Sequence, residues 1–464
     1  MQRAREQPER ALRLAGATPS RAFTQATAAA FGVLTSVGVV GTLYQRGWGR
    51  VPFSVPSWPW YHSLPFYLFF DPQLAPRWAA VAVPVALAAA AGVVLLHRGS
   101  LAWPARIAAV AGCELVLALA VAATAGGPVA WRAPLAFPGE YPQGVGLVGS
   151  IPAFLRAFPS LVPALPFHAQ GHPAGAMVLY DLLDRAWAGP QGAALLTVAL
   201  GCLGAVAAAG LARDELGEAG GRLALALWAL SPAVVLYTAT SADAVFAVVL
   251  AGAALAAHRG LVRRSTGWTV AGGALLWVGS MLTYAAVLLL AFLLVRAVGR
   301  LREERGWVTR WAAMTAATVL GLVALLRLTA GYDPLAALGA VHRAYAAAPG
   351  SASRPYLLWL AGDPVAFAGM LGVPLAAALA ARAATVVRER AWASVDAAVL
   401  ACLLAASAWG FSRGEVERIW LFLVPLALVP VTRQLLAWRV RLPVVAALLV
   451  AQTLAVQALF STRW

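Results

Sequence analysis

The chain has 464 residues, of which 61% are hydrophobic and only 12% are charged. This composition excludes an ordinary soluble domain and predicts a polytopic membrane protein, so the lipid bilayer is the first partner implied. A net charge of +16 would favour nucleic acid in a soluble domain. Here the basic residues are all arginine and lie at the ends of apolar segments, where they orient a membrane protein, so no nucleic-acid partner is predicted.

The N-terminal segment, residues 1–21, is rich in arginine and is predicted to be cytoplasmic. The apolar run that follows is too long for a signal-peptide core and lacks a clear cleavage site, so we expect a retained first span, with a cleaved signal peptide as the alternative. Arginine-rich loops recur at every second turn of the chain. Their distribution predicts a multi-pass membrane protein with its N-terminus cytoplasmic and its C-terminus outside.

The apolar segments predict an all-α bundle of about thirteen transmembrane helices, because a span needs roughly 20 apolar residues. The run 222–258 is too long for one helix, and its Ser231-Pro232 and polar residues predict a hairpin that turns outside near Asp243. The predicted spans are 22–43, 78–96, 103–125, 190–212, 222–238, 243–258, 267–282, 284–297, 311–330, 360–381, 394–411, 418–432 and 441–460.

Under this topology the polar sequence collects on the external side. The loop 126–189 is long and rich in Pro, Gly and aromatic residues, and two of its stretches predict short helices at the interface. A second external loop covers 331–359, and a charged turn covers 412–418. The predicted organisation is a cytoplasmic segment 1–21, two added spans in 22–102, a core in 103–432 and a final span in 433–464.

Two acidic residues are candidates for catalysis. Glu140 stands in "FPGEYPQG" beside Tyr141, and the prolines around it would hold a general base on a rigid backbone. A solvated loop carboxylate is the other interpretation. Asp243 stands at the hairpin tip on the same side, where it could line a cavity, cap the following helix, or do both.

Histidine and arginine supply the candidate ligands for an anion. His168 and His172 in "HAQGHPAG" could donate to an anion, carry protons or bind a metal, although no third metal ligand has a recognisable spacing. The proline after His172 predicts a helix start whose free N–H groups suit a phosphate. Arg413 and Arg418 in "FSRGEVERIW" could grip phosphate oxygens, or could belong to a charge cluster at the interface.

The order of these features resembles the GT-C membrane glycosyltransferases, in particular the protein O-mannosyltransferase and aminoarabinose transferase group and its bacterial relatives. The resemblance covers about residues 103–432. It rests on the acidic external loop, on Gly171–Gly175, where Ala174 replaces a usual second proline, and on the segment 412–420. It implies a GT-C-like bundle with Glu140 as the catalytic base, Asp71 being the alternative if the first external loop is the catalytic one.

The resemblance further implies inverting transfer of a sugar from a polyprenyl-phosphate donor to a lipid, glycan or protein acceptor on the extracytoplasmic face. Asp243 would be the second acidic site, which positions the acceptor or a divalent cation such as Mg²⁺ or Mn²⁺. The expected donor-binding residues are His168, His172, Arg413, Arg418, Tyr141 and Tyr284. A transporter or lipid flippase is the alternative function, and a noncatalytic membrane subunit is a third.

Overall fold

The computed structural model describes residues 19–47, 66, 69–72, 74–347, 356–410 and 412–461. Almost all of this part is helical. Its only sheet is the antiparallel pair of β1 (Phe69–Phe70) and β2 (Phe460–Ser461). Between their ends, helices satisfy the backbone N–H and C=O groups within the segment, which hydrocarbon requires because it supplies no water. The protein is therefore an all-α membrane protein, as its composition predicts.

Eight helices in the described residues are long and apolar enough to cross a membrane, or nine if the bent pair at 141–164 counts as one span. Two of them, 41 and 47 residues long, exceed roughly 60 Å at about 1.5 Å per residue and cannot be single crossings. The backbone leaves the helical conformation inside them, at Gly217 and Glu304. The predicted count of about thirteen spans stays a prediction.

The helices that build the bundle follow the apolar segments of the sequence. They are α2 (Pro19–Gly47), α3 (Pro76–Arg98), α4 (Trp103–Ala123), α9 (Pro190–Gly201), α10 (Gly204–Leu230), α11 (Pro232–Thr238), α12 (Asp243–Val262), α13 (Thr266–Leu282), η3 (Tyr284–Leu288), α14 (Leu289–Ala330), α16 (Tyr356–Leu371), α17 (Val373–Glu389), α18 (Val395–Trp409), α19 (Val416–Ile419), η5 (Trp420–Leu423), α20 (Val424–Ala437) and α21 (Leu442–Leu459).

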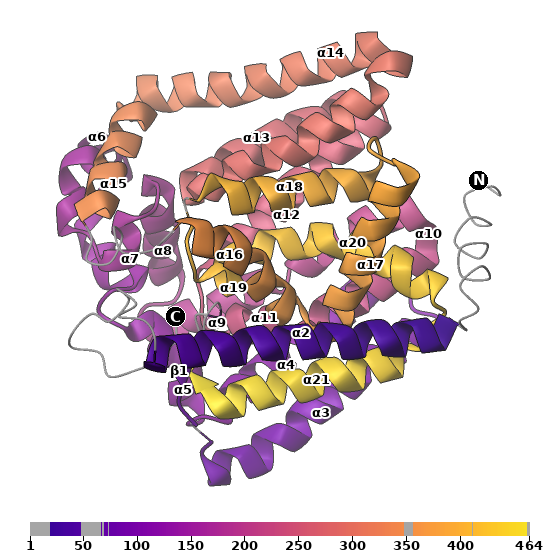
Figure 1. The fold of residues 1–464 in the computed structure, drawn as a ribbon. Helices are drawn as coiled ribbons and strands as arrows, with labels where there is room; N and C mark the ends of the chain where they lie inside the picture. Colours follow the sequence, from indigo (N-terminus) through magenta and orange to yellow (C-terminus); the bar gives the residue numbers. More distant parts are fainter. Residues whose placement is uncertain are drawn as a thin grey trace.

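Short helices gather at one end of the bundle, on the left of Figure 1, whereas α2 starts at the other end. Two of them, α6 and α8, occupy the stretches in which the loop 126–189 was predicted to form short helices. The short helices are α5 (Pro128–Ala136), η1 (Tyr141–Leu147), α6 (Ile151–Leu161), η2 (Val162–Ala164), α7 (Phe167–Gln170), α8 (Ala174–Ala186) and α15 (Pro334–Ala347).

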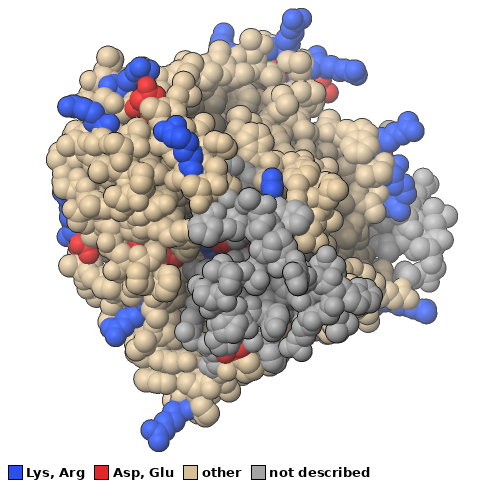
Figure 2. All heavy atoms as spheres, turned by 60° about the vertical axis from the view of Figure 1, so that its left-hand side comes forward, with Lys and Arg blue, Asp and Glu red and all other residues tan. Residues whose placement is uncertain are grey.

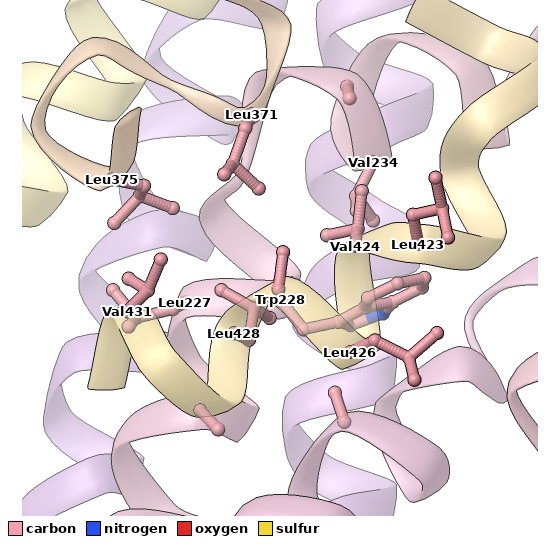
Figure 3. Close-up of a cluster of buried hydrophobic side chains, with 14 of the residues drawn as sticks. Leu227, Trp228, Val234, Leu371, Leu375, Leu423, Val424, Leu426, Leu428 and Val431 are labelled. Atoms are coloured by element: carbon pink, nitrogen blue, oxygen red, sulfur yellow. The ribbon is translucent and has the colours of Figure 1, made fainter. Parts of the chain in front are cut away.

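Two broken helices meet in the apolar core. The chain breaks between α10 and α11 at Ser231, and between α16 and α17 after Leu371. The Ser231 hydroxyl donates to the Leu371 carbonyl at 2.9 Å, and the Gln452 side-chain amide accepts from Val373 N–H at 2.9 Å and donates to Gly369 O at 2.6 Å. These bonds satisfy polar backbone that would be costly to bury unpaired. Apolar side chains from all four helices surround the breaks (Figure 3).

Charged residues tie the helices together at the other end of α12, about 20 residues or 30 Å from Asp243. Asp214 accepts from Arg259 and Arg263 at 2.6 Å each. Nearby, buried Asp396 pairs with Arg382 at 2.6 Å. Because charges inside a bundle are costly unless they are paired, this network explains why so many arginines can lie beside apolar helices.

Candidate functional site

Glu140 and His168 form the first polar pair of the site, although 28 residues separate them. His168 Nδ1 lies 2.7 Å from Glu140 Oε1, and the His168 backbone N–H donates to the Gly139 carbonyl at 3.0 Å. Glu140 itself is anchored through its N–H to the Phe137 carbonyl, also at 3.0 Å. The bend before η1 and the start of α7 are thereby joined twice, and Glu140 is a buried carboxylate instead of a solvated one.

Aromatic rings connect this pair with α8 and α12. Tyr141 stacks on Tyr180 of α8 with the ring centroids 5.2 Å apart and the planes 11° apart. Its edges meet the rings of His172 at 5.7 Å and Phe246 of α12 at 5.9 Å. Edge-to-face and offset-stacked rings are the favoured geometries for aromatic pairs. This packing fixes the position of His172 relative to the Glu140 loop.

His172 is held at the junction of α8 and α13. Its Nδ1 lies 3.1 Å from the Leu282 carbonyl at the end of α13. Burial lowers the pKa of His172, while Asp243 and the bond to Leu282 oppose that shift, and Arg418 reinforces it. The lowered pKa favours the neutral imidazole, whose Nδ1–H donates to the Leu282 carbonyl and whose Nε2 then carries only a lone pair.

The helix end beside His172 has partners of its own. α8 begins at Ala174 with Pro173 as its N-cap residue, so the predicted helix start is correct. The Ala174 N–H bonds to Tyr332, whose pKa is raised by burial to about 12, and the Ala176 N–H donates to the Pro173 carbonyl at 3.2 Å. Two of the first amides of α8 are therefore used within the protein, which weakens the predicted phosphate site at this helix end.

Asp243 and Arg418 form the second polar pair, across 175 residues of sequence. The Arg418 guanidinium bonds Asp243 Oδ2 and Glu415 Oε2 at 2.5 Å each. Asp243 is the first residue of α12, and its backbone N–H and its carboxylate both bond the Ser241 hydroxyl. The serine thus takes the capping role that was the alternative for Asp243, so the Asp243 carboxylate is available to pair with Arg418.

The two pairs belong to one group of interacting charges. Arg418 interacts electrostatically with Glu140 as well as with Asp243 and Glu415, and Tyr141 lies within reach of Asp243, Glu140 and Arg418. We call this group the polar cluster. Its members are Glu140, Tyr141, His168, His172, Asp243, Glu415 and Arg418.

A left-handed turn decides which arginine of the segment 412–420 enters the polar cluster. Gly414 and Glu415 have φ values of 83° and 61°. A Cβ at Gly414 would lie 2.8 Å from the Trp359 ring, so the close approach also needs glycine. After this turn Arg418 faces Asp243, whereas the Arg413 guanidinium lies 5.6 Å from the centre of the Tyr356 ring. The contribution of Arg413 to a phosphate site stays a prediction.

Two other residues that the sequence predicts for the functional site, Tyr284 and Asp71, are not members of the polar cluster. Tyr284 opens η3, two residues beyond the Leu282 carbonyl that bonds His172, and it is half-buried. Asp71 follows β1, and its backbone N–H donates to the Leu459 carbonyl at the end of α21 at 3.0 Å. The choice between Glu140 and Asp71 as the base stays a prediction.

The charges of the polar cluster are balanced by a guanidinium. In the described part of the chain, no three His, Cys, Asp or Glu side chains are grouped so that they could hold a metal ion. Arg418 occupies the position between Asp243 and Glu415 that a cation would otherwise take. The predicted Mg²⁺ or Mn²⁺ therefore has no preformed set of ligands among these residues.

Two aromatic residues of the site, Phe246 and Tyr180, were not predicted from the sequence. Phe246 lies three residues after Asp243 on the same face of α12, and that spacing could have revealed it. Tyr180 had no such signal, because its ring reaches Tyr141 only through the fold of the loop.

Figure 2 shows separate basic side chains and no continuous basic patch on the part of this face that the described residues form. Fold and site together define a multi-pass α-helical membrane protein with a buried polar cluster at one end of its bundle. No protein-family model, curated protein or solved structure matches the chain.

Proposed function

We propose that the protein is a membrane glycosyltransferase that moves a sugar from a polyprenyl-phosphate donor to a lipid, glycan or protein acceptor. One observation carries the proposal: a buried carboxylate–histidine pair lies beside a buried arginine at one end of an apolar bundle. The pair can remove a proton and the arginine can stabilise a phosphate. Apolar helices around them suit a donor with a lipid tail.

The roles follow from the contacts. The Glu140–His168 pair deprotonates the acceptor hydroxyl, which attacks the anomeric carbon in line as the lipid phosphate leaves, so the configuration inverts. Arg418 stabilises the charge that develops on the phosphate. His172 donates through Nδ1 to the Leu282 carbonyl, so its Nε2 lone pair accepts from a hydroxyl of the donor sugar in this proposal. Asp243 holds Arg418 and positions the acceptor. Tyr141, Tyr284 and Arg413 contribute to the donor site in this proposal.

Arg418 retains a donor for the phosphate. Its two terminal nitrogens bond carboxylates, but its buried Nε–H has no hydrogen-bond partner among the described residues. An unpaired buried N–H is costly, and a phosphate oxygen would relieve that cost. The arginine-rich end of the bundle favours the cytoplasm, so we infer that the polar cluster faces the outside of a bacterial plasma membrane, where a transferase draws on lipid-linked donors.

The broken helices give the transporter alternative its strongest support, since transporters bind substrates at such breaks. Here, however, the Ser231 hydroxyl and the Gln452 amide already bond the free backbone. Leu371, Trp228 and Val424 pack around the breaks in Figure 3. A break that is packed and paired offers no polar path, so the transferase is the better-supported proposal.

The test uses the full-length chain in lipid vesicles with a panel of tritium-labelled polyprenyl-phosphate hexoses and pentoses and with cell-envelope acceptors. We expect transfer by the wild type and a loss of about a hundredfold or more in Glu140→Gln. Glu218→Gln is the matched control, because Glu218 is 44% exposed at the other end of the bundle. Full transfer by Glu140→Gln would remove Glu140 from catalysis, and movement of a labelled lipid across the bilayer without transfer would favour a flippase.

A further inference from the structure

We propose that His168, rather than Glu140, receives the proton of the acceptor, and that Glu140 positions His168. This inference rests on the proposed transferase function and assigns the proton transfer within it. It makes Nε2 of His168 the basic atom and turns the catalytic carboxylate into a positioning group.

Glu140 and His168 differ in the solvent exposure of their side chains. The side chain of Glu140 is 5% exposed and that of His168 is 14% exposed, so the imidazole is the more accessible of the two groups. One oxygen of the carboxylate is already bonded to the imidazole at 2.7 Å. The imidazole is therefore the group that an acceptor hydroxyl can reach more readily.

Three contacts restrain His168. The His168 backbone N–H donates to the Gly139 carbonyl at 3.0 Å, and Nδ1 of its imidazole bonds the Glu140 carboxylate. The Phe167 ring lies 5.6 Å from the imidazole and packs beside it. A carboxylate at Nδ1 keeps a proton on that nitrogen and leaves the lone pair on Nε2, which is the arrangement that makes a histidine a general base.

The surrounding charges suit this transfer. His168 acts electrostatically on His172, so its imidazole belongs to the polar cluster. Glu140 is bonded to His168, while Asp243 and Arg418 act on the neighbouring His172. The carboxylates stabilise an imidazolium, and Arg418 is balanced by its own two acidic partners.

The step balances in atoms and charge. The O–H bond of the acceptor breaks, and its proton moves to His168 Nε2. The acceptor oxygen forms a bond to the anomeric carbon, while the bond from that carbon to the phosphate oxygen breaks and its electron pair leaves with the polyprenyl phosphate. The imidazolium then returns its proton to solvent or to the departing phosphate.

Two substitutions separate a base from a structural contact. His168→Gln keeps an N–H that can bond Glu140 but carries no basic nitrogen, whereas His168→Ala opens space for a small molecule. In the same vesicle assay we expect both to lose about a hundredfold or more of the transfer rate. Imidazole and methylimidazoles should restore transfer by His168→Ala, and the stronger bases should restore more. His342→Ala, an exposed histidine on α15, is the control and should show neither effect.

The outcomes distinguish this inference from the proposed function. Transfer by His168→Gln at the wild-type rate, or a loss in His168→Ala that no imidazole restores, overturns the role of His168 and leaves the transferase standing. A wild-type protein that transfers none of the labelled sugars overturns both. Thermal midpoints of the variants in detergent, expected within a few degrees of the wild type, keep a folding defect from imitating a catalytic one.

Discussion

Replacing Arg418 should destabilise the protein more than replacing either of its acidic partners. Arg418 bonds Asp243 and Glu415 at 2.5 Å each, and the side chains of Arg418 and Asp243 are 12% and 6% exposed. In Asp243→Asn the arginine keeps Glu415 as a counter-charge. In Arg418→Gln the two carboxylates lose the guanidinium that lies between them.

The geometry sets the magnitudes. Removing one partner of a buried pair and stranding the other costs about 3–5 kcal/mol, which we expect for Arg418→Gln. Asp243→Asn loses one charged hydrogen bond but strands nothing, so about 1–3 kcal/mol is expected. The double variant should be more stable than Arg418→Gln alone, because one of the two stranded carboxylates is gone.

Equilibrium unfolding in mixed detergent micelles, followed by tryptophan fluorescence, measures these free energies. Arg213→Gln is the control, because Arg213 pairs with Glu218 at 3.0 Å and both side chains are 44% exposed, so its loss should cost less than about 1 kcal/mol. Equal costs for Arg418→Gln and Asp243→Asn, or strict additivity in the double variant, would refute the reasoning.

Three more predictions concern buried polar groups. Glu114 of α4 accepts the Trp228 indole N–H at 3.0 Å. Glu114→Gln keeps an acceptor, whereas Glu114→Leu leaves the N–H unpaired and should lower the free energy of unfolding by about 1–3 kcal/mol. Equal unfolding free energies for the two variants would contradict this. Burial lowers the pKa of His172 from 6.5, so the unfolded chain binds more protons and the free energy of unfolding should fall as the pH drops below about 6.5. Unfolding curves recorded across this pH range should show a shallower fall for His172→Gln than for the wild type. Parallel pH dependences would argue against this role of His172. Asp396→Asn removes the carboxylate partner of Arg382 and should lower the free energy of unfolding by about 3–5 kcal/mol in the same detergent assay. A decrease below about 1 kcal/mol would show that Arg382 finds another partner.

Much of the short-range structure is readable from the residues. The polar residues before Asp243 predict the turn between α11 and α12, and the proline before Ala174 predicts the start of α8. The break between α10 and α11 at Ser231 falls inside the predicted span 222–238 and was not predicted. The break in the predicted span 360–381 was missed, although Gly372 adopts a φ of 119° there. Glycine alone does not reveal such a break, because the conformation depends on the packing of Leu449 and Pro232 against its Cα.

The sequence by itself determined that this is a helical membrane protein and that its polar residues collect in a few loops. Apolar composition and segment length decide that much, because hydrocarbon tolerates only backbone that bonds within itself. It also determined the candidates Glu140, His168 and Asp243. Only the tertiary structure decided their partners. His168 reaches Glu140 through the folding of the loop, and Asp243 receives Arg418 instead of Arg413 because the left-handed turn after Arg413 redirects the chain. Arg418 and Asp243 are 175 residues apart, and whether their side chains meet depends on helix packing and turn geometry. A local sequence pattern does not contain that information.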